Sequence, residues 1–262
     1  MTASITLSDS LQVQYLLRIG DTCLVLGQRL GEWCGHGPVL EEDIALTNMA
    51  LDLIGQTRAI YSHAAVLDGQ GLDEDQLAFL REERDYRNFS LAELPSGEQR
   101  PGDFAFTVQR NLMLATWLKL LWERLQDSSD SELAGIAGKA VKEARYHQQH
   151  AADWVLRLAD GTEESRRRSE NALTELWRYV PELFAHDAVD DAAVAAKLGP
   201  ARRDLQEPWQ AEMAAVFDES GLVPPAPSAF RSHGSTGMHT EHMGYLLADL
   251  QYLQRSFPGG VW

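Results

Sequence analysis

Apolar residues that recur every three or four positions are the feature of this sequence that most restricts its fold. One series runs through residues 16–33, and others run through 44–65, 104–125 and 133–158. This spacing places the apolar side chains on one face of an α-helix, which must pack against other helices. In 44–65 the expected stripe is Ile44, Thr47, Leu51, Ile54, Arg58, Tyr61 and Ala65. No segment shows a convincing strand pattern, so the sequence predicts an all-α fold.

Short or modest connections join the four long segments, which is typical of a four-helix bundle. The segment 221–237 is rich in proline, serine and glycine and is expected to be a loop. Additional helices are expected to pack along or across the bundle within a single domain spanning residues 1–262. Their expected positions are 73–89, 170–184, 190–197, 202–219 and about 243–257.

The charge and the composition exclude several classes of partner. Lysine and arginine number 23 and aspartate and glutamate number 39, so the formal charge is 23 − 39 = −16. Such an acidic chain repels a nucleic-acid backbone and an anionic membrane surface. The longest apolar stretch, 112–122, is too short to span a bilayer, and the first nine residues lack the features of a signal peptide. Cys23 and Cys34 would lie too far apart on one helix for a disulfide, so we expect free thiols and a cytoplasmic location.

Long-helix bundles often hold a di-iron site, and the sequence can be tested for its ligands. That site takes a glutamate from each of two helices and a Glu-x-x-His pair from each of the other two. Residues three apart share a helical face, so both side chains reach a central metal. None of the 39 acidic residues has a histidine three positions later. We therefore expect no complete di-iron site in this chain.

Asp52 is nevertheless notable, because it interrupts an almost wholly apolar run from Ile44 to Gly55. A buried carboxylate is costly unless it is paired or hydrogen-bonded. It is either a metal ligand or catalytic acid, or a structural ion pair with a basic residue. In the second case, truncating Asp52 to alanine should cost several kcal/mol. The candidate partners are Arg29, Lys119 and Arg145.

Two histidine clusters also leave alternatives open. Glu143, His147 and His150 fall within about 60° of one another on a helix, as half a metal site or as a polar edge of the bundle with His147 hydrogen-bonded in the core. His239 and His242 share a helical face, but a catalytic zinc needs three protein ligands. The start of a helix is the alternative there.

Five stretches resemble one known family in order along nearly the whole chain. They are RIGDTCLVLGQRLGEWCGH at 18–36, ALDLIGQ at 50–56, KEARYH at 142–147, GMHTEHM at 237–243 and LQYLQR at 250–255. They resemble the beta, or structural, subunits of the bacterial phenylacetyl-CoA epoxidases, which are multicomponent ring 1,2-epoxidases. The resemblance implies a ferritin-like bundle with additional flanking helices.

The resemblance also implies partners and cofactors. In that family a homologous alpha subunit holds the di-iron centre and performs the epoxidation of phenylacetyl-CoA during aerobic phenylacetate breakdown. A reductase with FAD and an iron–sulfur cluster delivers electrons from NADPH, and small accessory subunits complete the complex. The beta subunit carries no cofactor and supports the alpha subunit. The alternatives are an active di-iron oxygenase with Asp52, Glu143, His147 and His150 as atypical ligands, and a stand-alone acyl-CoA-binding module.

The family's beta subunit is also expected to approach the CoA substrate from outside the catalytic pocket. The corresponding stretch here is Asp85, Tyr86, Arg87 and Asn88. Arg87 could pair with a phosphate, Tyr86 could stack and Asn88 could donate a hydrogen bond. The alternative is a solvated helix face with Tyr86 anchored in the core.

Overall fold

The computed structural model describes residues 4–96 and 103–260. The regular secondary structure of these residues is entirely helical. They contain no β-strand, only an isolated bridge between His233 and Met238. The predicted all-α fold is therefore confirmed. The four long helices are α1 (Leu11–Gly31), α2 (Leu40–Asp68), α5 (Phe104–Leu125) and α6 (Ser131–Ala159). The shorter α-helices and 3-10 helices (η) are α3 (Glu74–Phe79), η1 (Glu83–Asp85), α4 (Ser90–Glu93), α7 (Glu163–Trp177), η2 (Val180–Phe184), α8 (Ala188–Ala195), η3 (Arg202–Leu205), α9 (Gln206–Ser220), η4 (Gly234–Thr236) and α10 (Glu241–Ser256).

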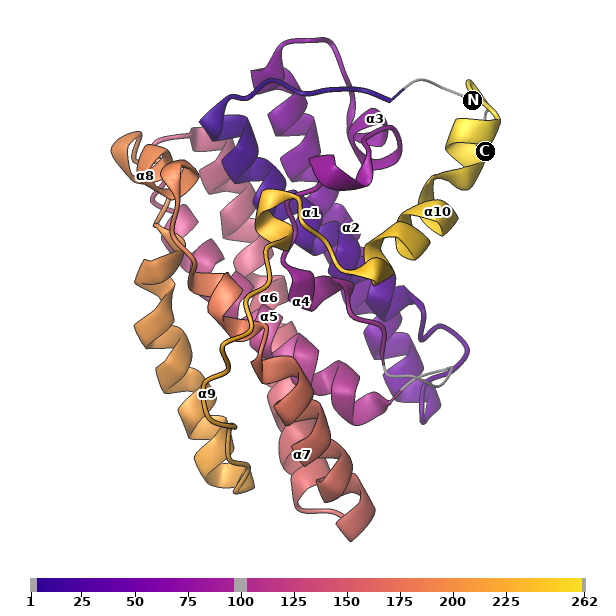
Figure 1. The fold of residues 1–262 in the computed structure, drawn as a ribbon, viewed down its shortest axis with the longest axis vertical. Helices are drawn as coiled ribbons and strands as arrows, with labels where there is room; N and C mark the ends of the chain where they lie inside the picture. The colour runs from indigo at the N-terminus through magenta and orange to yellow at the C-terminus, as the bar shows by residue number, and fades with distance from the viewer. Residues whose placement is uncertain (1–3, 97–102, 261–262) are drawn as a thin grey trace.

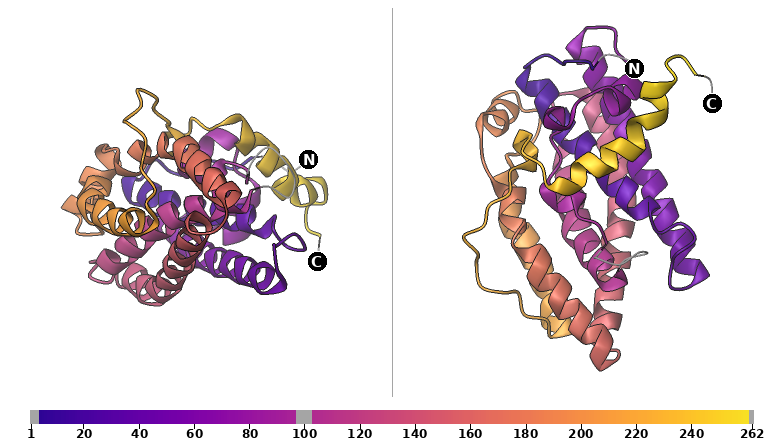
Figure 2. Two further views of the ribbon diagram at one scale, coloured as in Figure 1. Left: turned by 90° about the horizontal axis from the view of Figure 1, so that it is seen from below. Right: turned by 45° about the vertical axis from the view of Figure 1, so that its right-hand side comes forward.

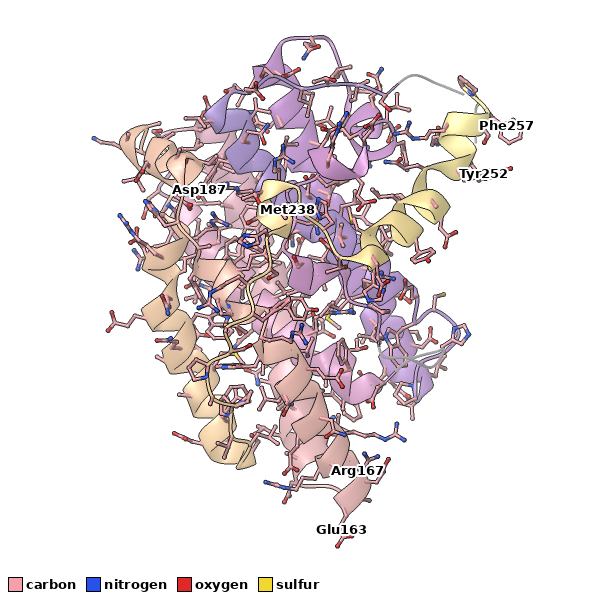
Figure 3. The ribbon with its side chains drawn as sticks, viewed as in Figure 1. Glu163, Arg167, Asp187, Met238, Tyr252 and Phe257 are labelled. Carbon is pink, nitrogen blue, oxygen red and sulfur yellow. The ribbon has the colours of Figure 1, made fainter. Side chains whose placement is uncertain are left out.

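The long helices form a four-helix bundle consistent with a ferritin-like fold (Figure 1). α1 packs along α2, α5 packs along α6, and α2 meets α6 to close one side. α7 and α9 pack against α5 and α6, and α8 packs against α1. Figure 2 shows the segment after α9 running back along the outside of the bundle to α10. α10 contacts α3 and η1, and its Tyr252 points away from the body, with 64% of its surface exposed (Figure 3).

Local signals in the sequence set the helix ends. The Asp103 carboxylate accepts a hydrogen bond from the Ala105 amide, and Asp130 caps α6 through the amides of Glu132 and Leu133. Caps of this kind contribute about 1 kcal/mol each. α2 ends at Gly69, whose φ of 73° is the left-handed conformation that glycine adopts without strain.

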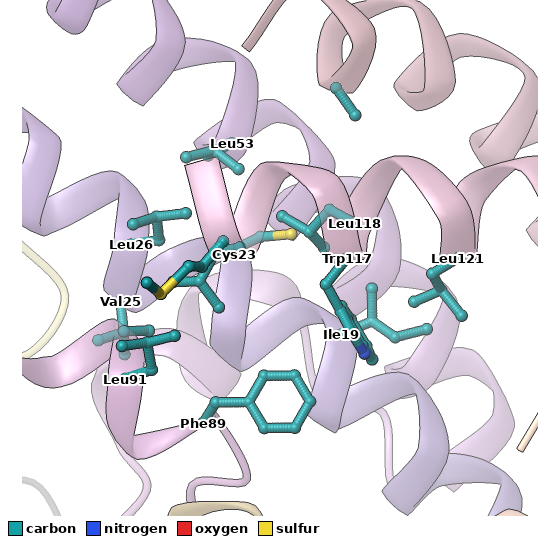
Figure 4. Packing of buried hydrophobic residues seen from close by; sticks show 14 of the residues in the cluster. Ile19, Cys23, Val25, Leu26, Leu53, Phe89, Leu91, Trp117, Leu118 and Leu121 are labelled. Carbon is teal, nitrogen blue, oxygen red and sulfur yellow. The ribbon is translucent and has the colours of Figure 1, made fainter. Parts of the chain in front are cut away.

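The core is one cluster of buried apolar side chains running through the centre of the bundle. Figure 4 shows Cys23 of α1 packed among leucines from three of the long helices. Gly20 allows α1 and α2 to approach closely, since a Cβ there would lie 2.7 Å from the Tyr61 ring. No helix in the described residues is both long enough and apolar enough to cross a bilayer.

Two predicted helices differ from the structure. The helix expected over 73–89 is only α3 and η1, because residues 81–88 turn around the buried guanidinium of Arg81. The helix expected over 170–184 is divided into α7, which begins at Glu163 and ends at Trp177, and the 3-10 helix η2. Thr162 caps α7, and charged residues form its solvated first turn. The expected loop at 221–237 is confirmed except for the single turn η4.

The apolar stripe predicted for α2 is wrong in the first half of the helix and correct at its end, where Tyr61 and Ala65 are buried. Ile44 is 51% exposed and Leu51 is 60% exposed, while Leu46, Met49 and Leu53 are buried. Both faces of this helix carry apolar residues, so periodicity alone did not distinguish the inner from the outer one.

Candidate functional site

Two histidines of α6 each contact one carboxylate of α2. His147 Nε2 lies 3.0 Å from Asp52 Oδ2, and His150 Nε2 lies 2.7 Å from Glu42 Oε2. Burial lowers the pKa of His147, and the neighbouring Asp52 only partly offsets this effect. His147 is therefore neutral at pH 7 and donates its Nε2 proton to Asp52. Each imidazole therefore contacts a different carboxylate.

A third polar contact crosses the same seam one turn along. Gln56 Nε2 donates to Glu143 Oε2 at 3.0 Å, and the Cys23 thiol lies 3.5 Å from Gln56 Oε1. Burial raises the pKa of the Cys23 thiol well above its ordinary value, so it stays protonated and packs as a small apolar residue. At this level of the bundle the Glu143 carboxylate is accompanied by an amide and a thiol.

These donors do not fit a di-iron centre. Within residues 4–96 and 103–260, no group of three or more histidine, cysteine, aspartate or glutamate side chains is placed to hold a metal ion. The centre between the long helices is packed with hydrocarbon, including Leu26, Leu53 and Leu118 (Figure 4). Near the C-terminal ends of α1 and α5, Glu32 binds Arg29 and Glu123 binds Arg145.

The predicted basic partner of Asp52 is wrong. Arg29, Lys119 and Arg145 each bind another carboxylate, and Asp52 binds His147 instead. The Asp52 side chain is also 36% exposed, because it sits at the edge of the α2–α6 seam rather than in the core. The expected cost of several kcal/mol for Asp52→Ala falls accordingly to about 1 kcal/mol, the value of one ordinary hydrogen bond.

The predicted CoA-contacting stretch runs from the last residue of η1 toward α4, and two of its side chains are buried. Tyr86 is fully buried and its hydroxyl donates to the Ala78 carbonyl oxygen at 2.5 Å. Asn88 is also fully buried and donates to Glu93 at 2.9 Å. The Asp85 carboxylate accepts a hydrogen bond from the Glu82 amide. In this conformation neither Tyr86 nor Asn88 reaches a ligand at the surface.

Arg87 is the one cation of that stretch and is partly exposed. Its Nε donates to Gln14 Oε1 at 2.9 Å, and its Nη1 donates to the carbonyl oxygens of Arg84 and Tyr86. No carboxylate among the described residues pairs with the guanidinium, so its Nη2 side is free to receive a phosphate. The prediction of a CoA contact therefore depends on Arg87.

A fully buried ion pair beneath this stretch was missed by the sequence analysis. Asp21 of α1 accepts hydrogen bonds from Arg81 at 2.6 and 3.0 Å, from the Tyr61 hydroxyl at 2.5 Å and from the Arg87 amide at 2.6 Å. Neither Asp21 nor Arg81 has an exposed side chain. The sequence does contain a signal for this ion pair, because Asp21 is the one acidic residue in the apolar run 16–30. It is a stronger case of a buried carboxylate than Asp52.

A second buried carboxylate, Glu93, is the hydrogen-bond partner of His239. Glu93 accepts hydrogen bonds from His239 Nδ1 at 2.6 Å, from Asn88, and from the amide and hydroxyl of Thr240 at 2.7 Å each. Burial lowers the pKa of His239, but the hydrogen bond and charge of Glu93 outweigh it and leave the pKa raised. The imidazole holds the start of α10 to α4. His242 lies one turn away, and its carbonyl oxygen accepts a hydrogen bond from Arg29 at 3.4 Å.

Comparison with known proteins identifies the family. The family model described as phenylacetic acid catabolic protein matches residues 2–262. The chain belongs to the phenylacetic acid catabolic protein family. It is 47% identical over 248 residues to one of the subunits of 1,2-phenylacetyl-CoA epoxidase of Escherichia coli (strain K12). The match covers 95% of this chain and 98% of that protein.

Several of the polar contacts involve residues of the stretches that carry the resemblance. Asp21 lies in 18–36, the Asp52–His147 contact joins 50–56 to 142–147, and His239 lies in 237–243. Residues of these stretches therefore take part in contacts between separate parts of the chain. None of them supplies a cluster of metal ligands in the described residues.

Proposed function

We propose that this chain is the beta, non-catalytic structural subunit of a phenylacetyl-CoA ring 1,2-epoxidase. Its role is to support a catalytic alpha subunit during aerobic phenylacetate degradation. Membership of the phenylacetic acid catabolic protein family and 47% identity to a subunit of the Escherichia coli epoxidase support a place in such a complex.

The observation that carries the structural role is the arrangement of donors between α2 and α6. A di-iron carboxylate site needs four carboxylates and two histidines directed at one centre. Here each histidine is engaged by a separate carboxylate, and Gln56 and Cys23 stand at the next level. A chain with this interior contributes packing and binding surface rather than oxygen chemistry.

The remaining components follow from the proposed complex. The alpha subunit supplies the di-iron centre, and a reductase with FAD and an iron–sulfur cluster supplies electrons. Phenylacetyl-CoA binds in the complex, where Arg87 is the residue of this chain proposed to meet a CoA phosphate. We propose that the complex works in the cytoplasm.

The proposal is tested by reconstitution. The alpha subunit, with its reductase and accessory subunits, is assayed for epoxidation of phenylacetyl-CoA with and without this chain. We expect stable co-purification and activity that depends on this chain, together with wild-type activity for Asp52→Asn and Glu143→Gln. Activity of this chain with the reductase but without the alpha subunit would contradict the proposal.

A further inference from the structure

A pocket of about 370 Å³ lies between the end of α7 and the segment that follows α9. Its lining includes Trp177 and Arg178 from the end of α7, and Pro225, Ser228 and Phe230 from the later segment. None of these residues takes part in the contacts between α2 and α6 or belongs to the predicted CoA-contacting stretch. We call this feature the α7 pocket.

Aromatic rings form two fixed walls of the α7 pocket. The Trp177 ring packs against the rings of Trp209 and Phe217, with ring centres 5.8 Å apart in each case. The Phe230 ring meets Tyr179 edge to face, with ring centres 5.1 Å apart. Because neighbouring rings already hold them, these two walls offer apolar surface to a ligand at little cost in side-chain ordering.

A short turn holds Phe230 at the pocket. Arg231 Nη1 donates to the carbonyl oxygens of Ser228 and Phe230 at 2.7 Å each, and the Phe230 amide donates to Ser228 Oγ at 3.0 Å. Arg231 is exposed, and no carboxylate in the described part of the chain pairs with it. The turn therefore places an uncompensated positive charge beside the pocket.

Arg178 brings a second cation to the pocket itself. Its guanidinium carbon lies 4.0 Å from the centre of the Phe230 ring and 5.5 Å from that of Tyr179, and the residue is exposed. Within residues 4–96 and 103–260 no oxygen accepts its side-chain N–H groups, and Glu175, three positions earlier, forms no ion pair with it. A guanidinium that stacks on a ring keeps its edge N–H groups available, and these match a carboxylate with two parallel hydrogen bonds.

The charges around the pocket favour an anion. No acidic residue is among the described residues that line it. The C-terminal end of a helix carries about half a negative charge, so the two guanidinium groups at the end of α7 leave the site positive. The rest of the chain is strongly acidic, with a formal charge of −16. An anionic ligand would therefore be attracted to this site and repelled from most of the remaining surface.

The volume restricts the ligand to a small molecule. Ligand pockets enclose about 300–1,000 Å³, and this one lies near the lower end of that range. A single aromatic ring with one acidic group suits this space, whereas a nucleotide is larger. The ring would meet the two aromatic walls, and the acidic group would meet the guanidinium.

We propose that the α7 pocket binds a small aromatic carboxylate, whose carboxylate pairs with Arg178 and whose ring lies against Trp177 and Phe230. The site is separate from the role proposed above, because it is complete within this chain. Its test therefore needs no partner subunit, and a failure of the reconstitution experiment leaves it intact.

The test measures binding of small probes to the purified full chain by saturation-transfer NMR titration. We expect benzoate and phenylacetate to bind with a Kd of about 1 mM or lower, as is usual for ligands of about ten non-hydrogen atoms. Benzamide keeps the ring and lacks the charge, and acetate keeps the charge and lacks the ring. Each of these two should bind at least about tenfold more weakly than the aromatic acids.

Variants of the arginine locate the site. Arg178→Gln should weaken binding of phenylacetate at least about tenfold with an unchanged thermal midpoint, since the side chain is exposed and forms no ion pair. Arg178→Lys keeps the charge but loses the planar fork, and should weaken binding about threefold. Arg157 is the matched control, because it is also exposed and lies 5.2 Å from the centre of the Trp154 ring, outside the pocket. Arg157→Gln should bind like the wild type.

Several outcomes would overturn the proposal. They are the absence of saturable binding to either aromatic acid, equal binding of benzamide and benzoate, and wild-type binding by Arg178→Gln. Tighter binding of AMP than of either acid, lost in Arg178→Gln, would assign the pocket to a nucleotide instead. If Arg178→Gln lowers the thermal midpoint, Arg178→Lys decides the matter, and binding equal to that of the wild type would then count against the proposal.

Discussion

Removing the buried carboxylate of Asp21 should be among the most damaging single changes to the fold. Asp21→Ala deletes the acceptor of four hydrogen bonds and leaves the fully buried guanidinium of Arg81 without its counter-charge. Burial alone would lower the pKa of Arg81, but Asp21 outweighs it and raises the pKa above its ordinary value. Breaking such a pair costs about 3–5 kcal/mol. At about 2–4 °C per kcal/mol for a chain of this size, the thermal midpoint should fall by about 6–20 °C.

Urea unfolding followed by circular dichroism measures the change, with an exposed ion pair as control. Glu74 and Arg58 lie 3.3 Å apart with the arginine 70% exposed, so Glu74→Ala should cost less than about 1 kcal/mol. The double variant Asp21→Leu with Arg81→Met removes both charges and should be more stable than Asp21→Ala alone. The reasoning is refuted if Asp21→Ala loses no more stability than Glu74→Ala.

Three further predictions concern the polar contacts. Because the pKa of His239 is raised, its hydrogen bond to Glu93 should stabilise the fold fully below the unfolded pKa of about 6.5, and less as pH rises through the folded pKa. The difference in free energy of unfolding between wild type and His239→Gln, measured with urea at pH 6 to 9, should therefore decrease with rising pH. An increase in this difference would contradict the prediction. Asp52→Asn should change stability by about 1 kcal/mol or less while leaving iron content and activity of the reconstituted complex unchanged, and a large loss of activity would favour a ligand role. Arg87→Ala should raise the KM for phenylacetyl-CoA severalfold with little change in kcat, whereas an equal KM would exclude the proposed phosphate contact.

The bundle could be predicted because its helices obey simple local rules. Periodicity located the long helices α1, α5 and α6. The inner face of the first half of α2 could not be predicted, because Ile44 and Leu51 satisfy helical spacing as well as the buried residues do. Which apolar face turns inward is decided by the neighbouring helices, and those are set only in the folded chain.

The types of residue at the candidate site could be predicted from the sequence, but the hydrogen-bond and ion-pair partners of these residues could not. The lack of Glu-x-x-His spacing is a property of one helix and can be read directly. The contacts of Glu93 with His239 and of Asp21 with Arg81 join residues far apart in sequence. Charged residues within apolar runs signal that a partner exists, but not which one it is.

The most direct test of the account is the iron content of each separated chain. The alpha subunit and this chain are co-expressed in iron-replete medium, separated under mild conditions and analysed by inductively coupled plasma mass spectrometry. We expect stoichiometric iron with the alpha subunit and only background iron with this chain. Stoichiometric iron in this chain, lost on His147→Ala, would show that α2 and α6 assemble a metal site and would contradict the structural role.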